Sequence, residues 1–133
     1  MNTNQLIIEQ VSPFDVPTTV EKLIAAADKR EWQNPANHNL QQSLAKSGKE
    51  VRPVQVVEIC KSDYSGKMLE RNDERISSIL MPCRISVYTE QGKTKIGLIK
   101  PAQMLLTLSQ DKALAEVANK VEEQTMQMVD EAK

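Results

Sequence analysis

Alternating side chains between Cys83 and Leu98 constrain the fold of this chain most strongly. Every second residue from Cys83 to Val87 is of a type that packs in a core, and the alternation resumes after the turn sequence E-Q-G-K at residues 90–93. A period of two is typical of a strand with one buried face. A glycine-containing turn between two such runs predicts a β-hairpin. The fold must therefore contain an antiparallel sheet that is covered on one side.

Three more segments are strand candidates. Leu6 to Val11 and Val54 to Cys60 are short apolar runs bounded by prolines or polar residues. The segment from Glu31 to Asn37 contains Pro35, so it is expected to be an irregular edge strand or a loop. The chain thus has up to five strands.

Helical periodicity marks the segments between these runs. An apolar stripe of three- and four-residue spacing predicts a helix from about Val16 to Ala27, with Asp15 or Thr18 as its N-cap. Another stripe predicts a long helix from Ser109 or Asp111 to the C-terminus. Shorter helices are expected at residues 39–47, before Gly48, at residues 64–72 with Asp63 as cap, and at residues 102–108. The sequence predicts one α+β domain over residues 1–133.

Composition narrows the classes of function. The net charge is −1, with 17 basic and 18 acidic residues and no basic patch, so a nucleic-acid partner is not expected. No apolar run approaches the ~20 residues of a membrane helix, so no membrane partner is expected either. The N-terminus lacks the pattern of a secretory signal, and two cysteines are too few for a disulfide framework. The cytoplasm is the expected compartment.

Cys60 and Cys83 are the first candidates for chemistry, because each stands where a predicted strand meets the polar excursion between them. If the two strands pair antiparallel, both thiols lie at the same end of the sheet, whereas parallel strands would separate them by roughly 20 Å. Two neighbouring thiolates can bind a soft transition metal such as copper or zinc, or form a disulfide. The simpler alternative is that both are small buried apolar residues.

Four other residues complete the candidate set. Met81 is a soft donor close to Cys83, and His38 is the lone imidazole of the chain. His38 is expected to lie away from Cys60 within one subunit, as an ordinary surface histidine. Arg84 can hold an anion if it lines a pocket, and Tyr64 is a candidate ligand contact, although both residue types are commonly surface or packing residues.

Catalytic motifs are absent from the sequence. It contains no G-x-S-x-G, phosphate-binding glycine loop or H-E-x-x-H. The acidic residues Glu70, Asp73 and Glu74 alternate with arginines, which is typical of a solvated helix surface. An enzymatic function is therefore not favoured.

The order V-R-P-V-Q-V-V-E-I-C, then L-M-P-C-R-I-S-V-Y-T-E-Q-G-K, then a C-terminal helix, resembles the domain-of-unknown-function-302 family. The resemblance extends over roughly residues 6–108. It implies a curved antiparallel sheet of about five strands with helices packed on one face, and subunits paired as homodimers. It implies no activity, since the family name itself records none.

Three hypotheses follow from these observations. In the first, the chain is a small non-catalytic binding module that holds a soft metal or metal cofactor at Cys60 and Cys83. In the second, it is a structural or interaction homodimer whose cysteines only pack. In the third, the two thiols act as a redox switch.

Overall fold

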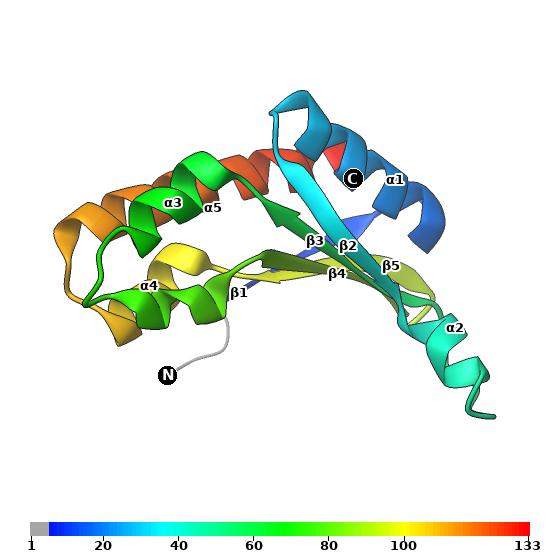
Figure 1. Ribbon diagram of the computed structural model, residues 1–133. Coiled ribbons are helices and arrows are strands. Elements are labelled where there is room, and N and C mark those ends of the chain that lie inside the picture. Colours follow the sequence, from blue (N-terminus) through cyan, green and yellow to red (C-terminus); the bar gives the residue numbers. More distant parts are fainter. Residues whose placement is uncertain (1–5) are drawn as a thin grey trace.

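Five strands form one antiparallel sheet in the order β1-β5-β4-β3-β2 (Figure 1). This computed structural model describes residues 6–133. The strands are β1 (Ile7–Ser12), β2 (Gln33–Asn39), β3 (Val54–Cys60), β4 (Cys83–Glu90) and β5 (Lys93–Ile99). The α+β class and the five-stranded antiparallel sheet predicted from the sequence are confirmed.

The hairpin of β4 and β5 follows the expected turn. Gln91 and Gly92 both have positive φ angles, of 54° and 75°, and Glu90 pairs with Lys93. Two consecutive left-handed residues are typical of the turn type whose twist matches that of the flanking strands. The hairpin therefore sets the register between β4 and β5.

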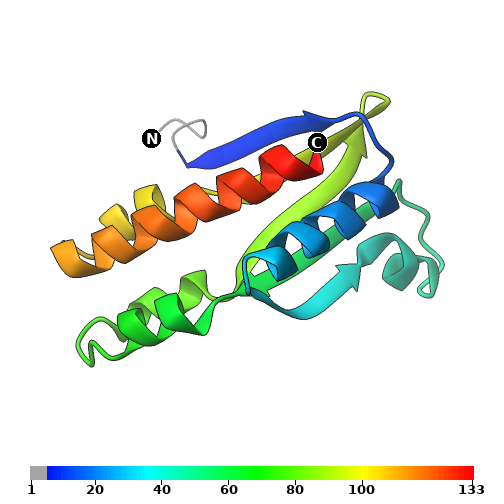
Figure 2. The same ribbon diagram turned by 90° about the horizontal axis from the view of Figure 1, so that it is seen from above.

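Two helices cover one face of the sheet, α1 (Val16–Lys29) and α5 (Lys112–Ala132) (Figure 2). The carboxylate of Asp15 caps α1 by accepting a hydrogen bond from the N–H of Thr18 at 2.9 Å. Asp111 caps α5 by accepting from Ala113 and Leu114. Apolar residues of both helices pack on the inward side chains of the strands, and the core includes Leu23, Val57, Ile85, Val87, Ile96 and Met128.

A helical extension projects beyond one end of the sheet (Figure 1). It consists of α3 (Ser62–Leu69), the short 3₁₀ helix η2 (Arg75–Leu80), α4 (Pro101–Leu108) and the first half of α5. A second apolar cluster holds it together, formed by Met68, Ala102, Leu105, Leu114 and Ala118. The remaining helix, α2 (Leu40–Ala45), follows β2 at the opposite end of the sheet.

Local details differ from the expectations in three places. Helix α3 begins at Ser62 after Lys61 and has no side-chain cap, so the expected capping by Asp63 is wrong. The segment around Pro35 is a true edge strand, but its register shifts between Gln33 and Ala36. No helix was expected at η2, because the six residues R-I-S-S-I-L are too few to establish a helical stripe.

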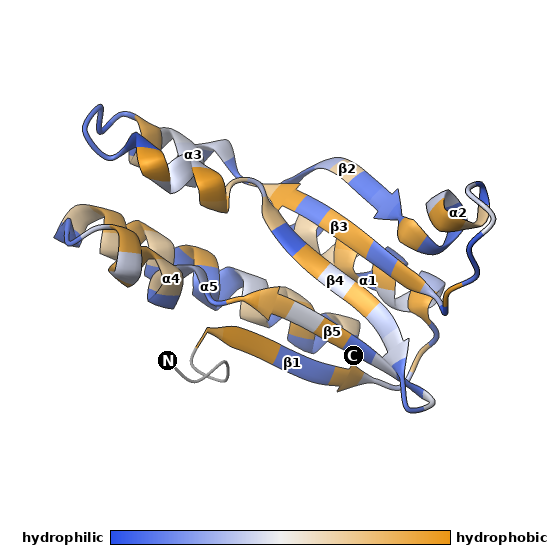
Figure 3. Cartoon of the chain, turned by 90° about the horizontal axis from the view of Figure 1, so that it is seen from below, coloured by the Kyte–Doolittle hydropathy of each residue, from blue (hydrophilic) through white to orange (hydrophobic). Residues whose placement is uncertain are grey.

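No helix formed by residues 6–133 lies over the other face of the sheet (Figure 3). Strand pairing places Ile7 beside Ile99 and Glu58 beside Arg84 on this face. Several apolar side chains on this face are exposed, among them Ile7, Val11 and Ile99. Within residues 6–133, no helix has the length and apolar character that a membrane span requires.

Candidate functional site

Both cysteines line one apolar pocket where the end of the sheet meets the helical extension. Strands β3 and β4 are antiparallel, so the last residue of β3, Cys60, lies beside the first residue of β4, Cys83, which pairs with Ile59. The cavity has a volume of about 40 Å³. One buried water molecule needs about 10–15 Å³ of such cavity volume, so the space suits a single ion or a few water molecules.

Two methionines bring further sulfur atoms to the same pocket. Met81 stands two residues before Cys83, and Met68 reaches the pocket from α3. Met68 is almost completely buried. Four sulfur-bearing side chains therefore border one small cavity, and soft sulfur ligands are those that copper(I) prefers.

The two thiols differ in their surroundings, although both are half-buried and neither is in a disulfide. The thiol of Cys60 contacts the hydroxyl of Ser65 at 3.7 Å. Burial raises the pKa of Cys83 to about 12, and the neighbouring charge of Cys60 raises it further. Cys83 is therefore a neutral thiol at physiological pH, and a metal ion has to displace its proton in order to bind.

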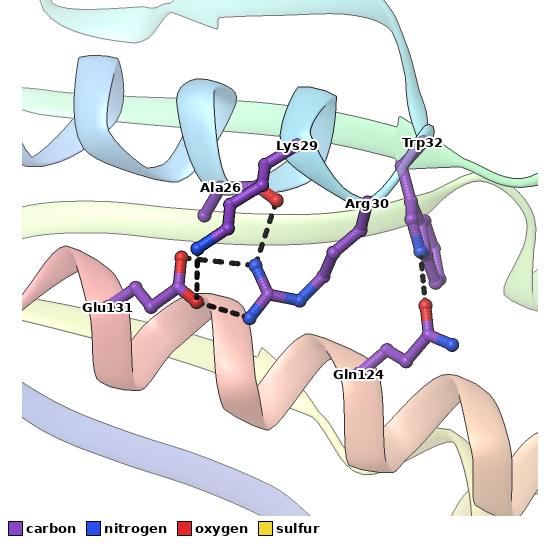
Figure 4. A network of polar contacts seen from close by, with 6 residues as sticks. All are labelled: Ala26, Lys29, Arg30, Trp32, Gln124 and Glu131. Atoms are coloured by element: carbon purple, nitrogen blue, oxygen red, sulfur yellow. Dashed lines mark hydrogen bonds and ion pairs between the residues drawn. The ribbon is translucent and has the colours of Figure 1, made fainter.

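Trp32 and Tyr64 form the aromatic wall of the pocket. Their ring centroids are 5.9 Å apart, and the rings are tilted by 56°. The indole N–H of Trp32 donates to the side-chain oxygen of Gln124 at 2.7 Å (Figure 4), and the amide of Gln124 donates to the hydroxyl of Tyr64 at 2.6 Å. These bonds tie both rings to α5 and fix the shape of the wall.

A charged cluster next to Trp32 holds the end of α1 against α5 (Figure 4). The guanidinium of Arg30 donates to both oxygens of Glu131 and to the carbonyl of Ala26, and Lys29 lies 3.7 Å from Glu131. The hydrogen bonds with Arg30 lower the pKa of Glu131 and raise that of Arg30. Because Trp32 follows two residues later, this cluster fixes the position from which the indole enters the pocket.

His38 and Arg84 lie outside the sulfur pocket. His38 is paired with Val56 in the sheet, and its Nε2 is 2.8 Å from Oε2 of Glu58. Arg84 forms an ion pair of 3.5 Å with the same carboxylate. Both side chains therefore belong to a polar group on the uncovered face, and His38 is not among the residues that line the pocket.

A second cavity of about 90 Å³ adjoins the first. Cys83 borders both cavities, while Arg84 borders only the second. The two ligand-contact candidates, Tyr64 and Arg84, thus stand at different cavities that share Cys83 as a wall.

Sequence reasoning identified Cys60, Cys83, Met81 and Tyr64, all of which line the pocket, but it missed Trp32 and did not single out Met68 among the methionines. The four-residue spacing of Tyr64 and Met68 on one helix face is the signal that points to Met68. No comparable signal exists for Trp32, because its position depends on the left-handed residue Glu31, whose φ is 63°.

The pocket offers few of the nitrogen and oxygen ligands that metal ions harder than copper(I) prefer. Across residues 6–133, no group of three or more His, Cys, Asp or Glu side chains is placed to hold a metal ion. Zinc usually takes four such ligands in a structural site. Any metal bound in the pocket must therefore accept thioethers or a low coordination number.

A family model and a solved structure show what the chain is similar to. The model for "Domain of unknown function DUF302" matches residues 8–132. A crystal structure of an uncharacterized conserved DUF302 protein from Bacillus stearothermophilus superposes with a TM-score of 0.85 at 24% identity, over 96% of this chain and 98% of that one. That likeness shows a shared fold, and no curated protein matches the chain. With nearly its whole length matched by the family model, the chain belongs to the DUF302 family.

Proposed function

We propose that this protein is a non-catalytic module that binds one soft metal ion, copper(I), in the sulfur pocket. The observation that carries the proposal is that Cys60, Cys83, Met68 and Met81 all line a single apolar cavity. Thiolate and thioether sulfur select copper(I) over harder ions.

The size of the cavity supports an ion over an organic cofactor. Pockets for drug-sized ligands measure roughly 300–1,000 Å³, whereas this cavity measures about 40 Å³. A porphyrin or nucleotide would require the surrounding elements to move. A single ion requires only that the cysteine thiols lose their protons and that the sulfur side chains adjust their rotamers.

An anaerobic titration with copper(I) against a competing chelator tests the proposal. Trp32 is the single tryptophan and borders the pocket, so its fluorescence should be quenched as one ion per chain binds. The variant with Cys60→Ser and Cys83→Ser should lose this binding. Met81→Leu should weaken it, while Met126→Leu, an exposed position on α5, should leave it unchanged.

Binding of copper(I) by the double serine variant as tightly as by the native protein would contradict the proposal and favour cysteines that only pack. The redox hypothesis gives a different result, because thiol titration would then show two reactive thiols that disappear together on mild oxidation. Metal analysis of protein purified anaerobically from its own source should find copper. We propose the cytoplasm as its compartment, since thiols stay reduced there, and imaging of a tagged chain tests this.

We further propose that the protein acts as a homodimer. The uncovered face of the sheet and its margin expose Ile7, Val11 and Ile99, whose side chains are 45%, 50% and 48% accessible. Apolar side chains grouped on a face with no covering element favour association. Sedimentation analysis over a range of concentrations should show a dimer, and a monomer at every concentration would contradict this second proposal.

A further inference from the structure

The two edges of the sheet differ in how far they resist pairing with another strand. At the β2 edge the register shifts between Gln33 and Ala36, and Pro35 lies within the irregularity. The side-chain amide of Asn34 donates to the carbonyl of Glu58 and to the side chain of Asn37. Prolines and bulges are common protections of a sheet edge against strand addition. The β2 edge is therefore protected against the addition of another strand.

The β1 edge carries none of these protections. Strand β1 pairs with β5 without a shift from Ile7 opposite Ile99 to Ser12 opposite Thr94. Its sequence, I-I-E-Q-V-S, contains no proline, glycine or lysine. In the sheet formed by the described residues, nothing pairs with the outer side of β1 (Figures 2 and 3). An edge of this kind is a template for a further strand.

The orientation of the backbone shows which groups that further strand would meet. The N–H of Lys100 donates to the carbonyl of Leu6 at 2.6 Å, so Leu6 directs its backbone groups toward β5. Backbone direction alternates along an antiparallel strand. Ile7, Glu9 and Val11 therefore direct their N–H and C=O groups outward, away from β5.

We propose that β1 of a second copy of this chain pairs antiparallel with β1, with Glu9 on the two-fold axis. This inference rests on the self-association proposed above and adds its surface and its register. The outward N–H and C=O groups of Ile7, Glu9 and Val11 then bond to the same groups of the other copy. The two sheets become one continuous sheet.

In this register the side chains of β1 are compatible with those of β1 in the second copy. Ile7 lies opposite Val11 of the second copy, and both are exposed and β-branched in the monomer. Two Glu9 carboxylates would repel each other on the axis, but each is turned toward its own sheet. Glu9 accepts a hydrogen bond from Tyr88 at 2.6 Å and lies 3.5 Å from the ammonium of Lys95.

The two neighbouring registers that keep the faces aligned are less suitable. With Ile8 on the axis, Glu9 would oppose the apolar Ile7. With Gln10 on the axis, Glu9 would oppose the apolar Val11, and Pro13, which has no N–H, would oppose Ile7. One hydrogen bond at each end of the ladder would be lost. Charge and backbone chemistry therefore select the register centred on Glu9.

Val11→Pro tests the pairing directly. Because the N–H of Val11 points outward, proline there removes a bond to the second copy without removing one to β5. The dissociation constant of the dimer should rise at least tenfold. Val11→Lys, which places a charge opposite Ile7, should do the same while leaving the backbone intact. Val51→Lys, at another exposed apolar position, is the matched control and should leave the dimer unchanged.

Hydrogen exchange tests the register. In concentrated protein the amides of Ile7, Glu9 and Val11 should exchange slowly, and on dilution they should become fast while those of Ile8 and Gln10 stay slow. A dimer that persists in both Val11 variants, or fast exchange at Glu9 in the dimer, would overturn the β1 pairing and leave self-association standing. A protein that is monomeric at every concentration would overturn both, and neither result affects the copper titration.

Discussion

Tyr88 on β4 reaches Glu9 on β1 across the strand that separates them. Its hydroxyl donates a 2.6 Å hydrogen bond to the carboxylate, and its ring lies over Gly97 of β5, where a Cβ would stand 3.6 Å from the ring. An aromatic ring over a strand glycine covers backbone that would otherwise be exposed. Burial raises the pKa of Tyr88 to about 12, and the hydrogen bond to Glu9 contributes to that shift.

Replacing Glu9 with glutamine should lower the pKa of Tyr88. The substitution removes the negative charge next to the phenol, while the burial of the ring remains, so the pKa should fall from about 12 without reaching the ordinary value of 10. Absorbance titration of tyrosinate in a Tyr64→Phe background measures it. Glu116→Gln, on the exposed side of α5, should leave the pKa unchanged. An unaltered titration in the Glu9 variant would contradict the hydrogen bond.

The same phenol predicts how stability depends on pH in alkaline solution. The folded state holds the Tyr88 proton more tightly than the unfolded state does, so its contribution is fully present below pH 10 and is lost as the pH rises toward about 12. Urea unfolding between pH 9 and 12 should show this loss in the native protein. Tyr88→Phe should show a smaller decline over the same window. Equal slopes for the two proteins would contradict the assignment.

Gln124→Leu should destabilise the protein by about 1–3 kcal/mol, the usual cost of leaving a buried donor without a partner. The substitution removes the acceptor of the Trp32 indole, which is only 5% exposed, and the donor to Tyr64. Urea unfolding followed by the fluorescence of Trp32 measures the loss. Gln127→Leu, three residues along the same helix and exposed, is the control and should change the free energy of unfolding by less than about 0.5 kcal/mol.

Asp111→Ala should cost about 1 kcal/mol, because Asp111 accepts from two backbone N–H groups at the start of α5. It also forms an ion pair with Arg71, and only 12% of its side chain is exposed. Asp63→Ala should be close to neutral in thermal unfolding, since Asp63 does not cap α3. A larger loss at Asp63 than at Asp111 would reverse the assignment of the caps.

In a Cys60→Ala background, alkylation of Cys83 by iodoacetamide should be slow at pH 7. The reactive species is the thiolate, and burial alone still raises the pKa of Cys83 above its ordinary value when Cys60 is replaced, so the rate should keep rising about tenfold with each pH unit beyond pH 9. Mass spectrometry of timed samples measures the rate. A plateau near pH 9 would show that the thiol is not buried as described, and denatured protein gives the reference rate.

Much of the fold follows from periodicity. The alternation from Cys83 to Leu98 defines the hairpin. The apolar stripes of α1 and α5 define the helices that cover it, because each stripe must be buried against another element. The helix cap at Asp15 was one of two options that the sequence left open, and the structure selects it through the hydrogen bond from Thr18.

The pocket was only partly predictable. Its two cysteines lie at strand ends, and strand pairing alone brings them to one end of the sheet. Trp32 is held at the pocket by hydrogen bonds that link it to Gln124 and Gln124 to Tyr64. The first pair is separated by 92 positions in the sequence and the second by 60, so no local pattern encodes these contacts. The path of η2 depends on its packing against α3 and α4 within the helical extension, which the sequence does not display.

The irregular β2 edge has a consequence for the number of chains that can join. A sheet with two open edges can pair with further copies at both sides and grow into a fibre. A sheet with one open edge has no unpaired edge left after it forms a dimer. Pro35 and the shifted register around it leave only one such edge. If copies join through β1 as proposed, assembly should therefore stop at the dimer rather than continue into a fibre.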